Sequence, residues 1–319
     1  MENLESGKPL LSVVIPLYNS SVYLNDLFKS IDNQIFHNYE LLIIDDGSSD
    51  NTYSKITEYA QINRRARIFH QENSGQSAAR ELGIQHARAP WVTFIDGDDY
   101  IASNHFEELA KEFLHTEASI IMVNVMRVDN DGNMLGLEMS GLTPGKYSGG
   151  KLREVWLNGV IPGFLWNKAF RKDDLKSIQI VFSENFMEDV RIVNELILRG
   201  AQIFFSDIAT YYYRQHNDSS VHRAMRETEW EGMNQALLSM ETIVTNPREL
   251  KLLRGRYIRS YSFLLRGTSS MWMKSHNREI RNVLNGPHMK WLQFGRLRDR
   301  LMIFIGKHFL WLFVLINPQ

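Results

Sequence analysis

Residues 91–99 have the sequence WVTFIDGDD, a short apolar run that ends in three carboxylates. Similar arrangements occur earlier in the chain, in LSVVIPLYN at 11–19 and in ELLIIDDGS at 40–48. Apolar runs of this length, rich in β-branched residues and separated by helix-like segments, predict buried strands that alternate with helices. Such alternation gives a mainly parallel sheet, in which the carboxyl ends of the strands share one edge. The sequence therefore predicts an α/β domain whose three polar clusters face one crevice.

Helical periodicity between these runs places the connecting elements. The first helix is expected over 20–34, where two serines at its start can cap it. Further helices are expected to begin at 51–52 and at 74–75 and to span 103–115, and a strand is expected at 120–128.

The chain is less regular after this strand. The sequence DNDGN at 129–133 lacks the distal glutamate of a calcium loop, so it predicts a β-turn between two strands. The Gly-rich stretch 136–150 predicts a mobile loop. From residue 225 on, the pattern is helical.

Composition narrows the possible functions. The 319 residues are enough for one large domain or two smaller ones, and the absence of cysteine excludes disulfides, cysteine nucleophiles and thiolate metal sites. The polar start, residues 1–9, lacks the apolar core of a signal peptide, which predicts a cytoplasmic protein. The net charge is −1, yet residues 251–307 hold thirteen Lys or Arg against two Asp or Glu. A basic segment of this kind is attracted to anionic partners.

The C-terminal part mixes these basic residues with large apolar ones. WLQFGRLRDR at 291–300 fits a helix that lies in the interface of an anionic membrane, and the alternative is a helix packed on the catalytic domain. The apolar end, 301–318, is short and interrupted by Gly306-Lys307-His308, so it is a poor membrane span. No nucleic-acid motif is visible. We therefore expect peripheral contact with the cytoplasmic face of a membrane and no nucleic-acid partner.

The two acidic clusters are candidates for binding a nucleotide and a metal. Asp96 and Asp98, separated by a glycine that permits a tight turn, supply hard oxygen ligands suited to Mn²⁺ or Mg²⁺. Asp45 or Asp46 can accept hydrogen bonds from a base N–H or a ribose hydroxyl. For both clusters the alternative is a polar turn that caps the following helix.

Taken together, four linked motifs resemble the family 2 glycosyltransferases, a large group of inverting enzymes with a nucleotide-binding fold of the GT-A type. The resemblance covers about residues 10–225. The matching strings are VVIPLYN at 13–19, IIDDGSSDNT at 43–52, NSGQSAAR at 73–80 and FIDGDD at 94–99.

This resemblance implies a Rossmann-like GT-A catalytic domain over residues 1–225, with a nucleotide-binding part at 10–125 and an acceptor-side part at 126–225. The remaining residues, 226–319, form a helical, basic and aromatic C-terminal region that lies outside the shared pattern.

The resemblance also assigns the donor site. It implies that Pro16, Tyr18 and Asn19 form a wall around the uracil and ribose. It implies that Asp45 or Asp46 reads the base, and we favour Asp45.

Further motifs supply the contacts around the phosphates. Arg80 resembles the arginine that meets the nucleotide, although Glu81 stands where relatives usually have Asn. Asp96 and Asp98 match the Asp-x-Asp motif, and Asp98 is the better candidate for direct metal coordination.

Glu188 and Asp189 match the catalytic Glu-Asp pair of the family, at the start of a predicted helix. Inverting transfer needs one base that takes the proton from the attacking hydroxyl, and we expect Asp189 to be this base. Glu188 is expected to contact the acceptor or to orient the site. The alternative is two acids favoured at a helix N-terminus by the helix dipole.

The segment around Tyr213 and Arg214 resembles the Tyr-x-Arg loop of the family. The resemblance implies that Arg214 binds the diphosphate, and His216 or His222 is a possible metal ligand, although a loop histidine is usually only solvated. Trp166 and Lys168 resemble acceptor-side residues of bacterial members, with a core tryptophan as the alternative.

The resemblance as a whole implies a metal-dependent, inverting transferase that moves a single sugar from a nucleotide-sugar, most often a UDP-sugar, to a saccharide acceptor. Similar members extend lipid-diphosphate-linked saccharides in the synthesis of surface polysaccharides such as O-antigen, capsule or exopolysaccharide. The chain lacks the Gln-x-x-Arg-Trp motif of processive synthases, so we expect one sugar, or a few, per encounter.

Two other classes of protein remain as alternatives. A sugar-nucleotide pyrophosphorylase needs a Gly-rich strand-turn near the N-terminus, and residues 16–19 have the sequence PLYN instead. A non-catalytic nucleotide-sugar-binding protein on the same fold is disfavoured by the intact carboxylates at 96, 98 and 189.

Overall fold

Packing divides the chain into two compact units that interleave along the sequence. The first consists of Met1–Gly149, Gly163–Glu184 and Glu195–His216, and the second of Gly150–Pro162, Asn185–Asn194 and Asn217–Gln319. The assignment of a catalytic domain to residues 1–225 stays a prediction. The structure, a computed structural model, describes residues 8–114, 117–139, 141–178, 187–216, 227–268, 280, 284, 293 and 296–308.

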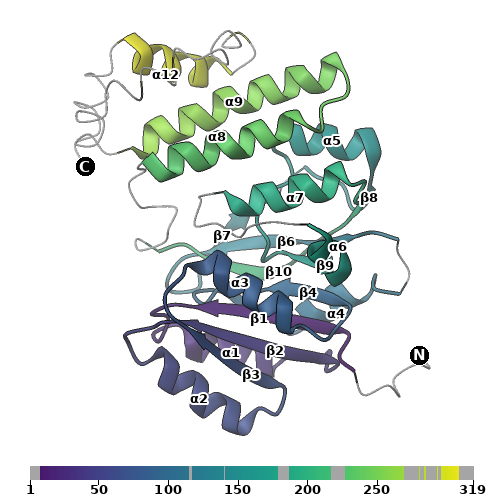
Figure 1. Cartoon of the computed structure of the whole chain (residues 1–319), viewed down its shortest axis with the longest axis vertical. Helices are drawn as coiled ribbons and strands as arrows, with labels where there is room; N and C mark the ends of the chain where they lie inside the picture. Colours follow the sequence, from purple (N-terminus) through teal and green to yellow (C-terminus); the bar gives the residue numbers. More distant parts are fainter. Residues whose placement is uncertain are drawn as a thin grey trace. The chain divides into compact units, whose positions relative to one another are not determined.

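A mixed β-sheet is the framework of the first unit (Figure 1). Its strands are β1 Leu11–Leu17, β2 Tyr39–Asp46, β3 Ala66–Gln71, β4 Trp91–Phe94, β5 Tyr100–Ile101, β6 Ile120–Val128, β7 Met134–Leu137, β8 Gly145–Tyr147, β9 Lys168–Arg171 and β10 Ile203–Arg214. Their order is β3-β2-β1-β4-β9-β6-β10-β5, with β7 beside β6 and β8 beside β10. The pairs β1–β2, β1–β4, β2–β3 and β6–β10 are parallel, whereas β9 runs antiparallel to both β4 and β6. The predicted α/β class is confirmed, and the sheet contains antiparallel strands as well as the expected parallel ones.

Helices that follow the strands cover this sheet. The first-unit helices are α1 Leu24–Asp32, α2 Thr52–Ile62, α3 Gln76–His86, α4 His105–Ala110 and α6 Lys172–Ser177. Helix α3 packs on β1 and β2. This approach is so close that a Cβ on Gly83 would lie 2.3 Å from Cγ1 of Val14, so only glycine fits at this position. In α1 the buried side chains recur at helical spacing and form one apolar stripe toward the core. These side chains are Leu24, Leu27, Phe28 and Ile31.

Several element boundaries differ from the sequence-based expectation. Helix α1 begins at Leu24 because the backbone N–H groups of Ser20 and Ser21 donate to Thr52 Oγ1 (2.8 Å) and Asp50 Oδ2 (3.2 Å), which holds this segment as a loop. Helix α4 is also shorter than expected. Strand β3 was not predicted, since its sequence ARIFHQ has no continuous apolar run. The stretch 136–150, expected to be only a loop, contains β8 and the end of β7.

The expected strand at 120–128 and the turn after it are confirmed. The carboxylate of Asp129 accepts hydrogen bonds from the backbone N–H groups of Asp131 (3.0 Å) and Asn133 (2.8 Å). Gly132 has φ 83°, a left-handed conformation that glycine adopts without steric cost. The turn joins β6 to the antiparallel β7.

Helices make up most of the described part of the second unit (Figure 1). They are α5 Gly149–Leu157, α7 Glu188–Leu198, α8 Glu227–Glu241, α9 Pro247–Gly267 and α12 Leu297–His308. Asn246 and Glu249 form a reciprocal cap at the start of α9: Asn246 Oδ1 accepts from Glu249 N (3.0 Å), and Glu249 Oε2 accepts from Thr245 N (2.7 Å). Pro247 at the first helical position fits the same start. Helix α9 packs against α8 and α12.

The membrane-facing segment expected at the C-terminus is described only in part. Residues 291, 292, 294, 295 and 309–319 lie outside the described residues. Within the part of the chain that the structure describes, no helix combines the length and the apolar character that crossing a bilayer requires.

Candidate active site

The loops that follow β1, β2 and β4 lie together at one edge of the first unit's sheet. The register sets Leu17 of β1 opposite Asp45 of β2, so these two strands end side by side. Asn19, with φ 51°, links their loops: its Oδ1 accepts from the backbone N–H of Ser49 at 2.8 Å. A Cβ on Gly97 would lie 2.6 Å from Cδ2 of Leu17, which shows how closely the loop after β4 approaches the end of β1. The predicted convergence of the three polar clusters is thus observed within this unit.

Asp46 fastens the loop after β3 to the end of β2. Its Oδ1 accepts from Gln71 Nε2 (2.7 Å) and from the backbone N–H of Ser74 (2.9 Å), and its Oδ2 accepts from the backbone N–H of Gly75 (2.9 Å). Gly47 permits this approach, since a Cβ there would lie 2.7 Å from Asn73 N. Both oxygens of Asp46 are therefore engaged in hydrogen bonds that hold the loop after β3 in place.

Asp45, the adjacent residue, is held differently. Its side chain is fully buried, and Oδ2 lies 2.7 Å from Nδ1 of His70. Oδ1 is also buried and has no hydrogen-bond partner among the described residues. An unpaired buried carboxylate oxygen costs free energy that an incoming N–H donor can recover. Asp45 is therefore better suited than Asp46 to read a base.

The carboxylate of Asp96 is bound by two side chains of α3. Its Oδ1 accepts from Arg80 Nη2 (2.9 Å) and from Gln76 Nε2 (2.9 Å). Burial raises the pKa of Asp96 above its ordinary value; the Arg80 guanidinium opposes this shift, and the charge of Asp98 adds to it. The pair thus links two predicted site residues and places the Arg80 cation beside the acidic cluster.

Asp98 is the carboxylate best placed to bind a divalent cation. Its side chain is 31% exposed, and its Oδ2 lies 2.8 Å from Nε2 of His216. The His216 ring also lies against Tyr23, with ring centroids 5.3 Å apart. Carboxylate oxygen and imidazole nitrogen suit Mn²⁺, and Mg²⁺ prefers the oxygen. No group of three acidic or histidine side chains arranged to hold a metal ion occurs in the described ranges. Asp98 and His216 therefore fit as a partial ligand set that oxygens of a bound donor would complete.

Asp99 and Tyr211 form a buried polar link that the sequence did not reveal. Tyr211 Oη donates to Asp99 Oδ2 (2.8 Å) and accepts from the backbone N–H of Asp96 (3.1 Å). Burial, with the charges of Asp98 and Asp96, raises the pKa of Asp99 well above its ordinary value. The backbone N–H of Arg214 donates to Asp99 Oδ1 at 2.8 Å. These hydrogen bonds hold the acidic turn against β10. In the sequence, the run of three tyrosines at 211–213 is the feature that could have indicated this contact.

Arg214, predicted to bind the diphosphate, is engaged with the protein itself. Its guanidinium donates to Asp98 O (2.9 Å), Asn130 O (3.3 Å) and Asp26 Oδ2 (3.0 Å). Its Cζ lies 5.4 Å from the ring centroids of both Tyr23 and Tyr100. A phosphate contact would require some of these bonds to break, and the role stays a prediction.

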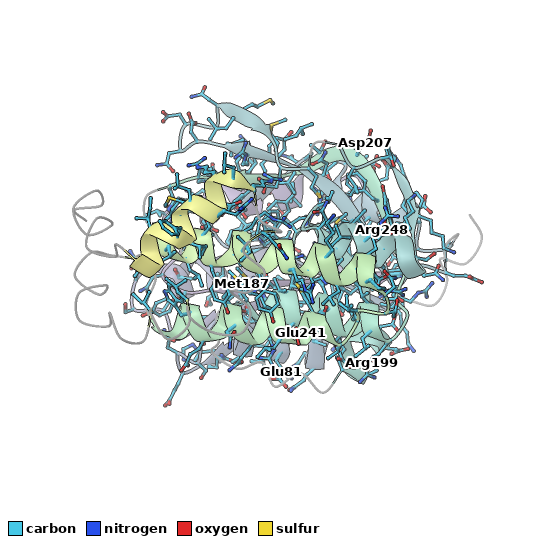
Figure 2. The ribbon with its side chains drawn as sticks, turned by 90° about the horizontal axis from the view of Figure 1, so that it is seen from above. Glu81, Met187, Arg199, Asp207, Glu241 and Arg248 are labelled. Carbon is cyan, nitrogen blue, oxygen red and sulfur yellow. The ribbon has the colours of Figure 1, made fainter. Side chains whose placement is uncertain are left out.

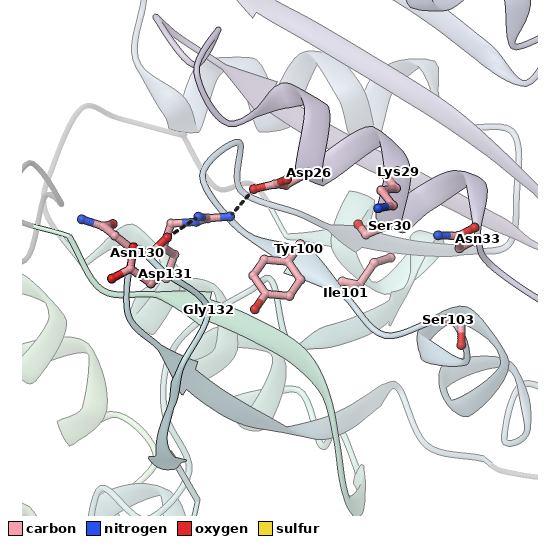
Figure 3. Close-up of a pocket in the computed structure, with 11 residues that line it drawn as sticks. Asp26, Lys29, Ser30, Asn33, Tyr100, Ile101, Ser103, Asn130, Asp131 and Gly132 are labelled. Carbon is pink, nitrogen blue, oxygen red and sulfur yellow. Dashed lines mark hydrogen bonds and ion pairs between the residues drawn. The ribbon is translucent and has the colours of Figure 1, made fainter.

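A cavity of about 370 Å³ lies beside this arginine (Figure 3). Helix α1 contributes Asp26, Lys29 and Ser30 to its wall, Asn33 follows at the end of this helix, and the turn at 130–132 faces them. Of the predicted site residues, Arg214 borders this cavity.

The remaining residues predicted for the donor wall differ in accessibility. Pro16 is buried within β1, opposite Ile44, so it is not exposed to a ligand. Tyr18 is 51% exposed, and Asn19 is exposed as well, so both are accessible to a ligand.

The two acceptor-side candidates, Trp166 and Lys168, are buried in the first unit. Trp166 stacks on Tyr211 at 4.5 Å and on Phe164 at 4.6 Å between ring centroids. Lys168 is fully buried, and its Nζ donates to Phe164 O and to Asn167 Oδ1 (2.8 Å). Direct contact with an acceptor would require this segment to move, so the alternative of a core tryptophan fits these positions better.

Glu188 and Asp189 begin α7, and Asp189 belongs to the second unit. Asp189 Oδ1 accepts from the backbone N–H of Val190 at 2.7 Å. The preceding Met187 has φ 70°, a conformation that is uncommon outside glycine and is often retained at functional sites. The prediction that Asp189 joins the carboxylates of the first unit stays a prediction. His222 lies outside the described residues.

A mixed sheet of this order, with nucleotide-binding and metal-binding candidates on the loops after β1, β2 and β4, defines an α/β transferase domain of the GT-A type. A family model described as Glycosyl transferase family 2 matches residues 12–178, and the chain belongs to that family.

Three relatives illustrate the similarity. EpsH of Bacillus subtilis is 25% identical over 224 residues, which cover 69% of this chain and 64% of EpsH. The minor teichoic acid biosynthesis protein GgaB of the same organism is 28% identical over 215 residues, 66% of this chain and 23% of GgaB. The matched regions thus span less than two thirds of either relative. The crystal structure of S. aureus TarS 1-349 in complex with UDP-GlcNAc superposes with a TM-score of 0.70 at 20% identity, covering 93% of this chain and 87% of that one.

Proposed function

We propose that this chain transfers a single sugar from a UDP-sugar to a saccharide acceptor, with inversion at the anomeric carbon. The observation that carries the proposal is the convergence of Asp45, at the carboxyl end of β2, with Asp96 and Asp98, on the loop after β4. Open α/β sheets bind nucleotides at this edge. The UDP-GlcNAc complex of TarS, a protein of the same fold, supports a UDP-sugar as donor.

In this proposal the base of the donor lies between Tyr18 and Asp45. Tyr18 offers an exposed ring for stacking, and Asp45 Oδ1 accepts the N–H at position 3 of uracil. Asn19 holds the two loops in place through its bond to Ser49. Arg80, held by Asp96, contributes positive charge toward the diphosphate.

Asp98 and His216 would hold a divalent cation, Mn²⁺ or Mg²⁺, which neutralises charge on the diphosphate when bound. Asp96 then acts through its bond to Arg80 and by its charge next to Asp98. The short link from Tyr211 to Asp99 keeps the backbone of this turn fixed while the donor binds.

Asp189 is the proposed base. As the acceptor hydroxyl oxygen attacks the anomeric carbon, Asp189 takes the hydroxyl proton, the bond from the anomeric carbon to the phosphate oxygen breaks, and UDP leaves. One displacement of this kind inverts the configuration. The proposal requires Asp189 of the second unit to reach the donor held by the first.

The acceptor is proposed to be a lipid-diphosphate-linked saccharide used in making a surface polysaccharide. The name of GgaB, a teichoic acid biosynthesis protein, supports a cell-surface product. Helix α12 exposes Leu297, Leu301 and Phe304 on one side, with Arg298 and Arg300 nearby, which suits peripheral contact with an anionic membrane at its cytoplasmic face.

A donor screen tests the function directly. Purified protein is incubated with a panel of UDP-sugars, Mn²⁺ and a synthetic lipid-diphosphate sugar, and UDP release and product mass are measured. We expect UDP release with one donor, a product that gains one sugar, and an inverted anomeric configuration by proton NMR. Retention of configuration would rule out a single displacement at Asp189, and long polymer products would rule out single-sugar transfer. Binding of UDP without any turnover would favour a non-catalytic protein.

A further inference from the structure

Two arginines of α9 in the second unit converge on the end of α5 and the residues that follow it. Arg256 and Arg259 are three residues apart, so they project from one side of the helix. Arg256 Nη1 donates to Trp156 O, and Arg259 Nη2 donates to Asn158 O at 2.9 Å. A Cβ on Gly159 would lie 3.9 Å from both Arg256 Nη1 and Arg259 Nη2, which places the two guanidiniums around one point.

These two cations are not neutralised by acids in direct contact. Neither Arg256 nor Arg259 forms an ion pair with a carboxylate of the described residues, although Arg153 in the same unit pairs with Glu249 at 2.9 Å. Burial, and then the neighbouring Arg259, lower the pKa of Arg256 to about 10, against the attraction of Asp189. Burial and Arg296 likewise lower the pKa of Arg259, against the attraction of Asp299. Positive charge is thus held close together at a cost that a bound anion would offset.

The pair also lies near the proposed base. Trp156 links this part of α9 to α7, because its carbonyl oxygen accepts from Arg256 and its Nε1 donates to Asn194 Oδ1 at 3.1 Å. The charge of Asp189, on the same helix as Asn194, raises the pKa of Arg256 against the effect of burial. The Arg256 guanidinium is oriented by the Trp156 ring, whose centroid lies 5.0 Å from its Cζ. Arginine forks held in this way suit the oxygens of a phosphate or diphosphate.

We propose that Arg256 and Arg259 form an anion subsite that binds the phosphate or diphosphate of the acceptor, beside Asp189. The assignment of the bound anion to the acceptor rests on the proposed function. Anion binding itself is inferred from the arginine pair alone. It narrows the acceptor class to saccharides that carry phosphate close to the reacting sugar. The pair would then hold the acceptor while Asp189 takes its proton.

The first test is calorimetric titration of the full chain with inorganic pyrophosphate in the presence of EDTA. We expect wild-type protein to bind pyrophosphate and the double variant Arg256→Gln/Arg259→Gln to bind at least about tenfold more weakly, because each charged fork contributes a bond of this order. Arg248→Gln is the matched control: Arg248 lies on the same helix, is 76% exposed and pairs with Glu154 (Figure 2). It should bind as wild type does.

A second pair of variants keeps the test decisive if the double glutamine variant unfolds. Arg256→Lys/Arg259→Lys retains the charge and loses the forks, so we expect intermediate pyrophosphate affinity with the same melting temperature as wild type. Asp98→Asn, which alters the proposed donor site, should leave pyrophosphate binding unchanged. The proposal is overturned if wild type does not bind pyrophosphate, or if binding is lost in Asp98→Asn and kept in the arginine variants.

The second test separates an acceptor phosphate from a lipid headgroup. With the lipid-diphosphate sugar as acceptor, the glutamine variant should raise the KM for acceptor about tenfold and leave the KM for donor unchanged. Sedimentation with phosphatidylcholine vesicles, with and without phosphatidylglycerol, should be the same for variant and wild type. Weaker vesicle binding with an unchanged acceptor KM would overturn the proposal in favour of a headgroup site. An absence of turnover in wild type would refute the proposed function, whereas the pyrophosphate result would still decide the anion site.

Discussion

The acidic turns of the first unit and the arginine pair of the second unit show two ways of holding charge. Asp46 accepts three hydrogen bonds, two of them from backbone N–H groups, and Asp96 accepts from Arg80 and Gln76. Arg256 and Arg259 instead donate to main-chain carbonyl oxygens, which have no net charge. The acids of these first-unit turns are thus paired within the protein, whereas the arginine pair forms no ion pair with a carboxylate of the described residues.

This difference follows from where the two sets of residues lie. Loops at strand ends bring backbone N–H groups toward the acids, and helix α3 supplies a cation, so carboxylates there are fixed before any ligand binds. On helix α9, Arg256 and Arg259 reach the carbonyl oxygens of Trp156 and Asn158 and no carboxylate of the described residues. The proposed donor residues of the first unit are therefore fixed by the protein itself, whereas the proposed acceptor residues of the second unit are less fully paired.

The largest expected effect is the loss of the base. Asp189→Asn should lower kcat by about 10³-fold and leave the KM for donor within about twofold, because proton transfer is lost while the first unit keeps its donor contacts. Steady-state UDP release at several donor concentrations measures both quantities.

Glu195→Gln, on the same helix, is the control, since Glu195 pairs with Arg199 at the surface. Nearly normal turnover in Asp189→Asn would mean that the base lies elsewhere and that the contrast between the units has no catalytic meaning.

Removal of the proposed metal ligand comes next. Asp98→Asn should lower kcat/KM by about 10²-fold, and excess EDTA should reduce the wild-type enzyme to a similar level, since the carboxylate acts through the cation. The two losses should not add. Asp207→Asn on β10, where the side chain is exposed, is the control and should behave as wild type (Figure 2).

Full turnover of wild type in EDTA would contradict a metal-dependent reaction. It would also leave the bond between His216 and Asp98 as a purely structural contact.

A third experiment separates the two neighbouring aspartates. Asp46→Asn should lower the free energy of unfolding by about 3 kcal/mol, because its amide NH2 cannot accept a hydrogen bond and would replace the oxygen that accepts from the Gly75 N–H or the one that accepts from Gln71 and Ser74. Asp45→Asn should change it by less than about 1 kcal/mol, since an amide oxygen can still accept from His70, but should weaken UDP binding. Urea unfolding and calorimetric titration with UDP measure the two effects. The opposite pattern would make Asp46 the residue that reads the base.

The sequence predicts the three parallel strands β1, β2 and β4 and the position of the acids that follow them. Apolar runs at 11–15, 40–44 and 91–95 are long enough to identify buried strands, and the parallel arrangement then brings their terminal acids to one edge. Strand β3, with the sequence ARIFHQ, is only partly buried along its length and has no continuous apolar run, so it carries no such signal.

Individual roles within the site could not be predicted in the same way. Asp45 and Asp46 are adjacent and chemically identical. Only the position of the loop at 71–75 decides which of the two carboxylates accepts hydrogen bonds from the loop backbone. The link from Tyr211 to Asp99 joins residues 112 positions apart, and the burial of Lys168 depends on Phe164 and Asn167 around it. Such contacts arise from tertiary packing, which local patterns do not contain.

The smallest expected effect concerns acid sensitivity in the first unit. His105 is fully buried, with Nδ1 2.8 Å from Thr210 Oγ1, and burial lowers its pKa from 6.5 to about 3. Between these values the unfolded chain binds a proton that the folded chain does not, so stability falls as the pH falls. At pH 5 this histidine should lower the free energy of unfolding by about 2 kcal/mol relative to pH 8.

His105→Asn can still bond to Thr210 but does not titrate, so its difference in unfolding free energy between pH 8 and pH 5 should be about 2 kcal/mol smaller than that of wild type. Urea unfolding at both pH values gives this difference, and the variant's lower stability at pH 8 cancels in the comparison. His37→Asn, at an exposed position, should leave the difference unchanged. An unchanged difference in His105→Asn would mean that His105 is charged in the folded state. The first unit would then contain a buried unpaired cation, and its contrast with the arginine pair of α9 would disappear.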